Sequence, residues 1–191
     1  FNTLCGRCQL KILIVANAPW AKTGYSLQGA SLARRLQADG HYVAYMCNYG
    51  LNGGNVTWNG IPCLTNGLEG GYADPIVHGH IRTIQPDLVL TIFDVWALRG
   101  REFPLPAAME HLAPRWAAWI PIDHSPVSAS NLEVVQRITY PISMSQHGHD
   151  QLNAAGFANT YIAHGVEKDV YFTTAGRREF RRLIELPEGA I

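Results

Sequence analysis

The 191-residue sequence has no excess of charge and no long apolar run, and each absence excludes a class of protein. Its 15 basic side chains are balanced by 15 acidic ones, so no positive field favours nucleic acid as a partner. No apolar run reaches the roughly 18 residues needed to cross a bilayer, and the start of the chain lacks the apolar stretch of a secretory signal. We therefore expect a cytoplasmic protein without a transmembrane segment, either free or peripheral to the inner membrane surface.

Cysteine pairs are scarce as well. Cys5 and Cys8 have the spacing of a metal or redox pair, but the second close pair that a zinc site requires is missing. Residues 1–10 precede the first strand pattern, and we interpret them as a leader or tag-like segment. Cys47 lies in an apolar strand pattern, which predicts a reduced thiol in the core.

Histidines are plentiful, but they lack the neighbours of a metal site. Two of the pairs, His78/His80 and His147/His149, fall in expected helices away from any carboxylate cluster. We interpret these side chains as solvated and expect no metal or other cofactor. A metal-dependent hydrolase that uses the histidines is kept as a rival hypothesis.

The common phosphate-binding motifs are also missing. There is no G-x-G-x-x-G for a dinucleotide and no G-x-x-x-x-G-K-[ST] for a nucleotide-hydrolysing P-loop. The composition, with 47% hydrophobic and 16% charged residues, is that of a soluble globular domain. The length allows one such α/β domain and not a second one.

Apolar, β-branched runs alternate with helical patterns along the chain. We expect strands at residues 11–16, 42–47, 56–58, 61–63, 88–92, 116–121, 140–143 and 160–162, and helices at residues 26–39, 74–84, 131–137, 147–155 and 177–186. This alternation predicts a Rossmann-like, doubly wound α/β fold, with a mainly parallel sheet and helices on both faces. Trp116 and Trp119 lie within a strand pattern and are expected in the core.

Local signals refine two of these elements. The first helix carries an apolar stripe of Leu27, Ala30, Ala33 and Leu36. Thr23 or Ser26 is expected to cap its start, and Gly40 suits the position after its end. Asn59-Gly60 favours a type I′ turn, so residues 56–63 are expected to form a hairpin, which Pro62 places at an edge of the sheet.

Ligands of such sheets bind at the carboxyl ends of the strands. The residues that follow the strands are Gly24, Tyr25, Asp94, Asp123, His124, Ser145, His164 and Gly165. We expect them to converge on one edge, where Trp96 would lie near Asp94 and pack on a ligand.

Two of these residues have a functional and a structural interpretation. Gly24 lets a phosphate approach the positive end of a helix, but a tight turn alone would also explain it. His124 follows Asp123 and is able to accept a proton near neutral pH, although a loop histidine is often only solvated.

Both ends of the expected domain resemble those of retaining GT-B glycosyltransferases, which move a sugar from a nucleotide-sugar donor. Residues 23–25 (Thr-Gly-Tyr), 32–36 (Leu-Ala-Arg-Arg-Leu) and 40–43 (Gly-His-Tyr-Val) resemble the opening of that family. Residues 161–166, 171–172, 177–182 and 186–187 resemble its passage from the first domain to the second. The resemblance covers residues 11 to 190 in order.

The resemblance implies roles for these residues. Gly24 and Tyr25 would approach the donor diphosphate, and His124 with Asp123 would face the reacting centre. Ser145, His164 and Gly165 would line the cleft, while Asp94 and Trp96 would lie on the acceptor side. The sequence departs from the family in having Lys22 and Tyr25 where a second glycine is common, and Glu167 where an aspartate is common.

The resemblance also implies a division of the chain. Residues 11–175 would form the Rossmann-like N-terminal, acceptor-side domain, and residues 176–191 would form a linker to a donor-binding domain that this sequence lacks. We therefore expect retention of configuration in the complete enzyme, and no transfer by this chain alone. The expected partners are a nucleotide-sugar donor, bound mostly by the missing domain, and a carbohydrate, lipid or other hydroxyl acceptor. A non-catalytic module that binds carbohydrate or protein is the alternative.

Overall fold

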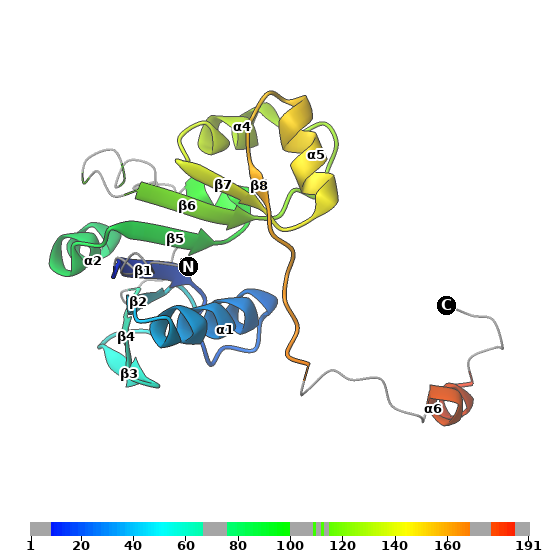
Figure 1. The fold of residues 1–191 in the computed structure, drawn as a ribbon, viewed down its shortest axis with the longest axis horizontal. Helices are drawn as coiled ribbons and strands as arrows, with labels where there is room; N and C mark the ends of the chain where they lie inside the picture. Colours follow the sequence, from blue (N-terminus) through cyan, green and yellow to red (C-terminus); the bar gives the residue numbers. More distant parts are fainter. Residues whose placement is uncertain are drawn as a thin grey trace, which may run out of the picture.

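The computed structural model describes residues 9–66, 76–99, 109, 112, 115–168 and 177–185. Within these residues, eight strands form one sheet in the order β3-β4-β2-β1-β5-β6-β7-β8 (Figure 1). Their bounds are β1 (Lys11–Ala16), β2 (Tyr42–Cys47), β3 (Val56–Trp58), β4 (Ile61–Leu64), β5 (Leu88–Ile92), β6 (Arg115–Ile120), β7 (Tyr140–Ser143) and β8 (Thr160–Tyr161). Neighbouring strands pair in parallel except β3 and β4. The predicted Rossmann-like fold is confirmed.

Helices pack on both faces of the sheet. They are α1 (Gly24–Ala38), α2 (Ile76–Ile84), the 3-10 helix η1 (Val95–Arg99), α4 (Ala129–Val135) and α5 (Gln146–Ala154). The last described helix, α6 (Arg177–Leu183), lies away from the sheet (Figure 1). Ile12 and Ile14 of β1 belong to the same core cluster as Ala33 of α1. Leu13 and Val15 belong to the opposite cluster, which also takes in residues of α2, η1, α4 and α5. Strand β1 is therefore buried on both faces, as its continuous apolar run predicts.

Helix α1 begins two residues before its predicted start, because Thr23 is its N-cap and accepts a hydrogen bond from the Ser26 amide at 3.1 Å. The predicted apolar stripe is wrong at Leu27, whose side chain is 61% exposed. The buried residues of α1 are instead Ser26, Gly29, Ala30 and Ala33. These small side chains allow the helix to approach the sheet closely, so that a Cβ at Gly29 would collide with the Tyr45 hydroxyl.

The predicted hairpin forms at the edge of the sheet. Asn59 and Gly60 both have positive φ angles, of 48° and 79°, which fits a type I′ turn. However, Pro62 lies on β4, which is the second strand, and β3 is the edge strand. This position is tolerated because β4 pairs with β2 only from Cys63 onward.

The strand order changes direction at β1, which lies between β2 and β5 (Figure 1). The chain runs from β1 outward to β2 and β4, and then crosses to β5 and continues outward to β8. In open α/β sheets, ligands bind in the crevice at the carboxyl ends of the strands beside such a reversal. The fold therefore directs attention to the loops that follow β1 and β5.

Some predictions lie outside the described residues. These include the Cys5/Cys8 pair, residues 171–172 and residues 186–187. Among the helices that the structure describes, none combines the length and the apolarity needed to cross a bilayer.

Candidate functional site

The predicted site residues leave the sheet at one edge. Strands β1, β5, β6, β7 and β8 are parallel, so their carboxyl ends lie on the same side of the molecule. The segments that follow them carry Gly24, Asp94, Asp123, Ser145 and His164 in turn. The topology thus brings to one edge residues that are far apart in the sequence.

Gly24 is the first residue of α1, and its surroundings are open. No described atom beyond its own helix and chain neighbours lies within 4 Å of the place where a Cβ would stand, and its φ angle is outside the positive range that favours glycine. The turn itself therefore does not require glycine here. The missing side chain leaves room beside the amino-terminal turn of α1, whose backbone N–H groups attract anions.

Asp123 and His124 form an exposed dyad after β6. The Nδ1 atom of His124 lies 2.8 Å from a carboxylate oxygen of Asp123, and its Nε2 atom accepts a hydrogen bond from the Ser128 amide at 3.3 Å. Since Nε2 accepts a hydrogen bond, Nδ1 carries the ring proton and donates a hydrogen bond to the Asp123 carboxylate. This hydrogen bond lowers the pKa of Asp123. Asp123 and the Ser128 amide thus fix the orientation of the His124 ring at the carboxyl edge.

Ser145 has a structural role at the start of α5. Its side chain is the N-cap and accepts a hydrogen bond from the Gly148 amide at 3.0 Å. A Cβ at Gly148 would lie 3.2 Å from Ile122 and 3.3 Å from the Ser145 hydroxyl, so the cap and the glycine fit each other closely. The capping hydroxyl still lies at the carboxyl edge.

The predicted acceptor-side residues follow β5. The Asp94 carbonyl accepts a hydrogen bond from the Ala97 amide at 3.0 Å, which begins η1, and Trp96 within η1 is 54% exposed. Tyr25 lies in the first turn of α1, is half-buried and packs against the α1-side core.

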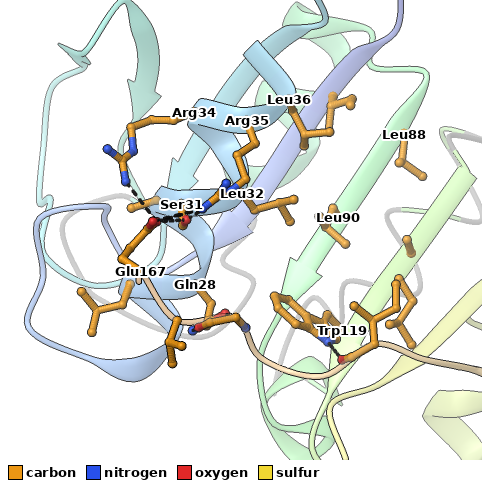
Figure 2. Close-up of a pocket in the computed structure, with 18 residues that line it drawn as sticks. Gln28, Ser31, Leu32, Arg34, Arg35, Leu36, Leu88, Leu90, Trp119 and Glu167 are labelled. Carbon is orange, nitrogen blue, oxygen red and sulfur yellow. Dashed lines mark hydrogen bonds and ion pairs between the residues drawn. The ribbon is translucent and has the colours of Figure 1, made fainter. Parts of the chain in front are cut away.

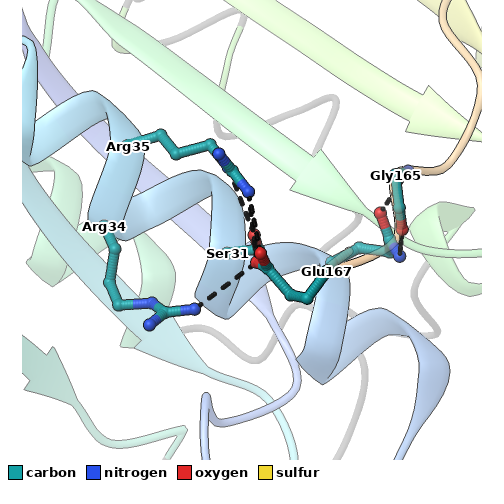
Figure 3. A network of polar contacts seen from close by, with 6 residues as sticks. Ser31, Arg34, Arg35, Gly165 and Glu167 are labelled. Atoms are coloured by element: carbon teal, nitrogen blue, oxygen red, sulfur yellow. Dashed lines mark hydrogen bonds and ion pairs between the residues drawn. The ribbon is translucent and has the colours of Figure 1, made fainter. Parts of the chain in front are cut away.

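Residues 162–167, here named the strap, run from the end of β8 to α1. The Trp119 indole N–H donates to the Ile162 carbonyl at 2.8 Å, and the His164 ring meets the Trp119 ring edge-on with centroids 5.0 Å apart. Partial burial lowers the pKa of His164. Gly165 is paired twice with the Gln28 side chain, since its amide donates to Oε1 at 3.1 Å and its carbonyl accepts from Nε2 at 2.9 Å (Figure 3).

The strap ends in a charged cluster on α1. The Glu167 carboxylate accepts hydrogen bonds from the Ser31 hydroxyl at 2.5 Å and from Arg35 at 3.1 and 3.2 Å, and it lies 3.6 Å from Arg34 (Figure 3). The Ser31 hydrogen bond and the charge of Arg35 lower the pKa of Glu167. These contacts join residues about 130 positions apart in the sequence.

A groove of about 650 Å³ lies between α1, the strap and the sheet. Figure 2 shows Leu32, Leu36, Leu88, Leu90 and Trp119 around it, with Gln28, Ser31, Arg34, Arg35 and Glu167 along the α1 side. Because Leu88 starts β5, the groove extends along the face of the sheet toward the amino ends of the strands. It shares Gly165 with the predicted site, but Gly24, Asp123 and His124 do not line it.

The interpretation of the four paired histidines as solvated is wrong for one member of each pair, His80 and His149. His80 lies 2.8 Å from the Thr65 carbonyl, and His149 lies 2.9 Å from the Asn159 side chain. Within the described part of the chain, no cluster of three or more metal-ligating side chains is present. Cys47 is a buried free thiol, as predicted, and Trp116 and Trp119 lie in the core.

Sequence reasoning missed the polar side of α1. Gln28, Ser31 and Arg35 recur at the four- and three-residue steps of one helical face, which also fits an ordinary solvated surface. Their contact with the strap depends on the path of a segment that lies more than 130 residues later, so the local pattern carried no signal for it.

Comparison with known proteins identifies the fold. No family model and no curated protein sequence matches the chain. Among solved structures, a glycosyltransferase from Rickettsia africae ESF-5 superposes with a TM-score of 0.56 at 14% identity, covering 95% of this chain and 51% of that chain. The chain therefore shares the fold of about half of that protein. A UDP-GlcNAc 2-epimerase from Methanocaldococcus jannaschii gives a TM-score of 0.54 at 11% identity, covering 81% of this chain and 45% of that chain.

At these identities the similarity concerns the fold alone. The chain spans about half the length of each of the two enzymes. A glycosyltransferase and a nucleotide-sugar epimerase thus share one architecture with this chain, and the choice of chemistry has to come from the residues at the carboxyl edge.

Proposed function

We propose that this chain is the acceptor-side half of a glycosyltransferase that moves a sugar from a nucleotide-sugar donor to a hydroxyl acceptor with retained configuration. The observation that carries the proposal is the carboxyl edge itself. There, the open amino-terminal turn of α1 at Gly24 and the Asp123–His124 dyad follow parallel strands of a sheet that superposes on half of a glycosyltransferase.

Each group has a chemical task in this proposal. The N–H groups at the start of α1 stabilise the phosphate charge that develops as the donor bond breaks, and Gly24 lets the phosphate come close. Asp123 holds the tautomer of His124, which faces the acceptor hydroxyl. Ser145, His164 and Gly165 line the cleft, and Asp94 and Trp96 lie on its acceptor side.

The test uses the protein expressed from its complete natural gene. It is incubated with a panel of nucleotide sugars and simple hydroxyl acceptors, and release of nucleoside diphosphate is measured. We expect release with at least one donor, and an NMR spectrum of the product that shows the anomeric configuration of the donor. Replacing His124 with alanine should lower the rate by about 100-fold or more and leave the melting temperature unchanged. No release with any donor would contradict the proposal.

A nucleotide-sugar epimerase half is a second candidate, because the epimerase superposes nearly as well as the glycosyltransferase. The same incubation distinguishes the two activities. An epimerase inverts one carbon of the sugar in its nucleotide-sugar substrate, here UDP-GlcNAc, and it needs no acceptor. An NMR spectrum of the nucleotide sugar recorded without acceptor would show that conversion.

A further inference from the structure

Helix α1 carries a stripe of residues that connects Gly24 with the strap. Gly24, Gln28, Ser31 and Arg35 are spaced by four, three and four positions, so they lie along one side of the helix. Gln28, Ser31 and Arg35 all bond to the strap, and Gly24 is the next position toward the helix amino terminus. The strap and the proposed phosphate position therefore share one face of α1.

The strap follows this stripe in a defined direction. Gly165 is opposite Gln28, and Glu167 is opposite Ser31 and Arg35, so the strap runs in the same direction as the helix (Figure 3). The residue before Gly165 is His164. His164 therefore precedes the point at which the strap first pairs with α1.

The position of His164 is fixed from the side of the sheet. Its ring lies edge-on against Trp119 of β6, and the indole N–H of Trp119 holds the preceding part of the strap at Ile162. His164 thus lies against a core tryptophan, one residue before the strap pairs with Gln28 of α1. Residues of the strap are otherwise exposed, with Ile162 at 47% and Val166 at 68%, so polar contacts rather than burial hold this segment.

We propose that Gln28 and Glu167 are positioning residues, which hold the strap on α1 and thereby keep His164 in place against Trp119 at the carboxyl edge. Gln28 fixes the strap backbone through both polar groups of Gly165, and Glu167 fixes the strap end through Ser31 and Arg35. The catalytic meaning of this placement rests on the proposed function, whereas the placement itself does not.

The test uses the full 191-residue chain, labelled for NMR, without any ligand. The variants are Gln28→Met, Glu167→Gln and the double variant, which remove the amide pairing and the charge while keeping side-chain length. The readouts are hydrogen exchange of the Gly165 amide and the ring-proton shifts of His164, which report its contact with Trp119. Gln146→Met is the matched control, because it removes an exposed hydrogen bond from the Gln146 side-chain amide to Asp150 within α5.

We expect the double variant to raise Gly165 exchange by about tenfold or more, with smaller increases in the single variants. The shifts that Trp119 imposes on His164 should shrink, and the pKa of His164 should rise toward its ordinary value. The Gln146→Met control should change neither readout. Unchanged Gly165 exchange and unchanged His164 shifts in the folded double variant would overturn the proposal.

Failure of the proposed function gives a different result. If the variants loosen the strap but the complete protein releases no nucleoside diphosphate, the positioning role stands and the transferase proposal fails. If the variants leave the strap unchanged while the complete protein transfers sugar, the positioning role fails and the transferase proposal stands.

Discussion

At the scale of single residues, two glycines on α1 have different reasons to be glycine. A Cβ at Gly29 would collide with the Tyr45 hydroxyl, which itself donates to the Asn17 carbonyl at 2.9 Å in the core. A Cβ at Gly24 would meet open space. Close packing of α1 on the sheet explains Gly29, and ligand access is the proposed explanation for Gly24.

The two glycines make a matched pair of alanine substitutions. Gly29→Ala should lower the free energy of unfolding by about 1–3 kcal/mol, because the core has no room for the methyl group. Gly24→Ala should change it by less than about 0.5 kcal/mol, because the site is exposed. Urea unfolding followed by circular dichroism measures both. Equal losses in the two variants would contradict the structural difference.

The lowered pKa of Glu167 predicts that the attachment of the strap to α1 depends on pH. Its pKa is lower in the folded protein than in the unfolded chain, first because of the Ser31 hydrogen bond and then because of Arg35. The stabilisation is therefore complete above the ordinary glutamate value of about 4.3 and is lost as the pH falls through the lowered pKa.

Ser31→Ala tests this order of causes. Removing the hydroxyl should raise the pKa of Glu167 toward its ordinary value, and the strap should detach at a higher pH than in the wild type. NMR titration of the Glu167 carboxyl carbon measures the midpoint. A midpoint that stays in place would mean that Arg35 dominates instead.

At the scale of elements, capping side chains determine where helices begin at the carboxyl edge. Thr23 caps α1, Ser128 caps α4 and Ser145 caps α5. Each cap follows a strand, and proposed site residues lie in the loop that it ends, at the cap itself or directly after it. Capping therefore fixes both the helix start and the position of the site.

Ser145→Ala should lower the free energy of unfolding by about 1 kcal/mol, because the Gly148 amide loses its acceptor. Ser145→Asp should restore much of that stability, since aspartate is also a good N-cap. Thermal unfolding of both variants measures the difference. If aspartate destabilises as much as alanine, capping is not the role of this hydroxyl.

At the scale of the whole molecule, the chain corresponds to half of each of the two enzymes with which it shares its fold. In the proposed function most of the donor is bound by another half. A ligand at a concentration equal to its dissociation constant stabilises a protein by only about 0.4 kcal/mol.

This chain alone should therefore respond weakly to donors. With nucleotide sugar at about 1 mM, the melting temperature should rise by less than about 2 °C, which corresponds to a dissociation constant of about 1 mM or weaker. Differential scanning fluorimetry with several nucleotide sugars measures the shift. A rise of 5 °C or more, or turnover by the chain alone, would show that this half binds the donor by itself.

Much of the fold follows from local sequence patterns. The continuous apolar run of β1, the Asn59-Gly60 turn and Gly40 after α1 were each predicted, and each is found in the structure. The start of α1 was misplaced because Thr23 and Ser26 are both good caps, and only the backbone path shows which one acts. Leu27 was included in the apolar stripe of this helix because a three-residue step does not reveal that smaller neighbours face the sheet.

The amino-acid sequence by itself determined the alternation of strands and helices, and hence which residues follow the strands at the carboxyl edge, because periodicity and capping act between residues within about four positions of one another. Only the tertiary structure decided how the strap joins α1. The pairing of Gln28 with Gly165 spans 137 positions and exists because the chain returns over the sheet after β8. Such a contact depends on how whole layers stack, and no neighbouring residue encodes it.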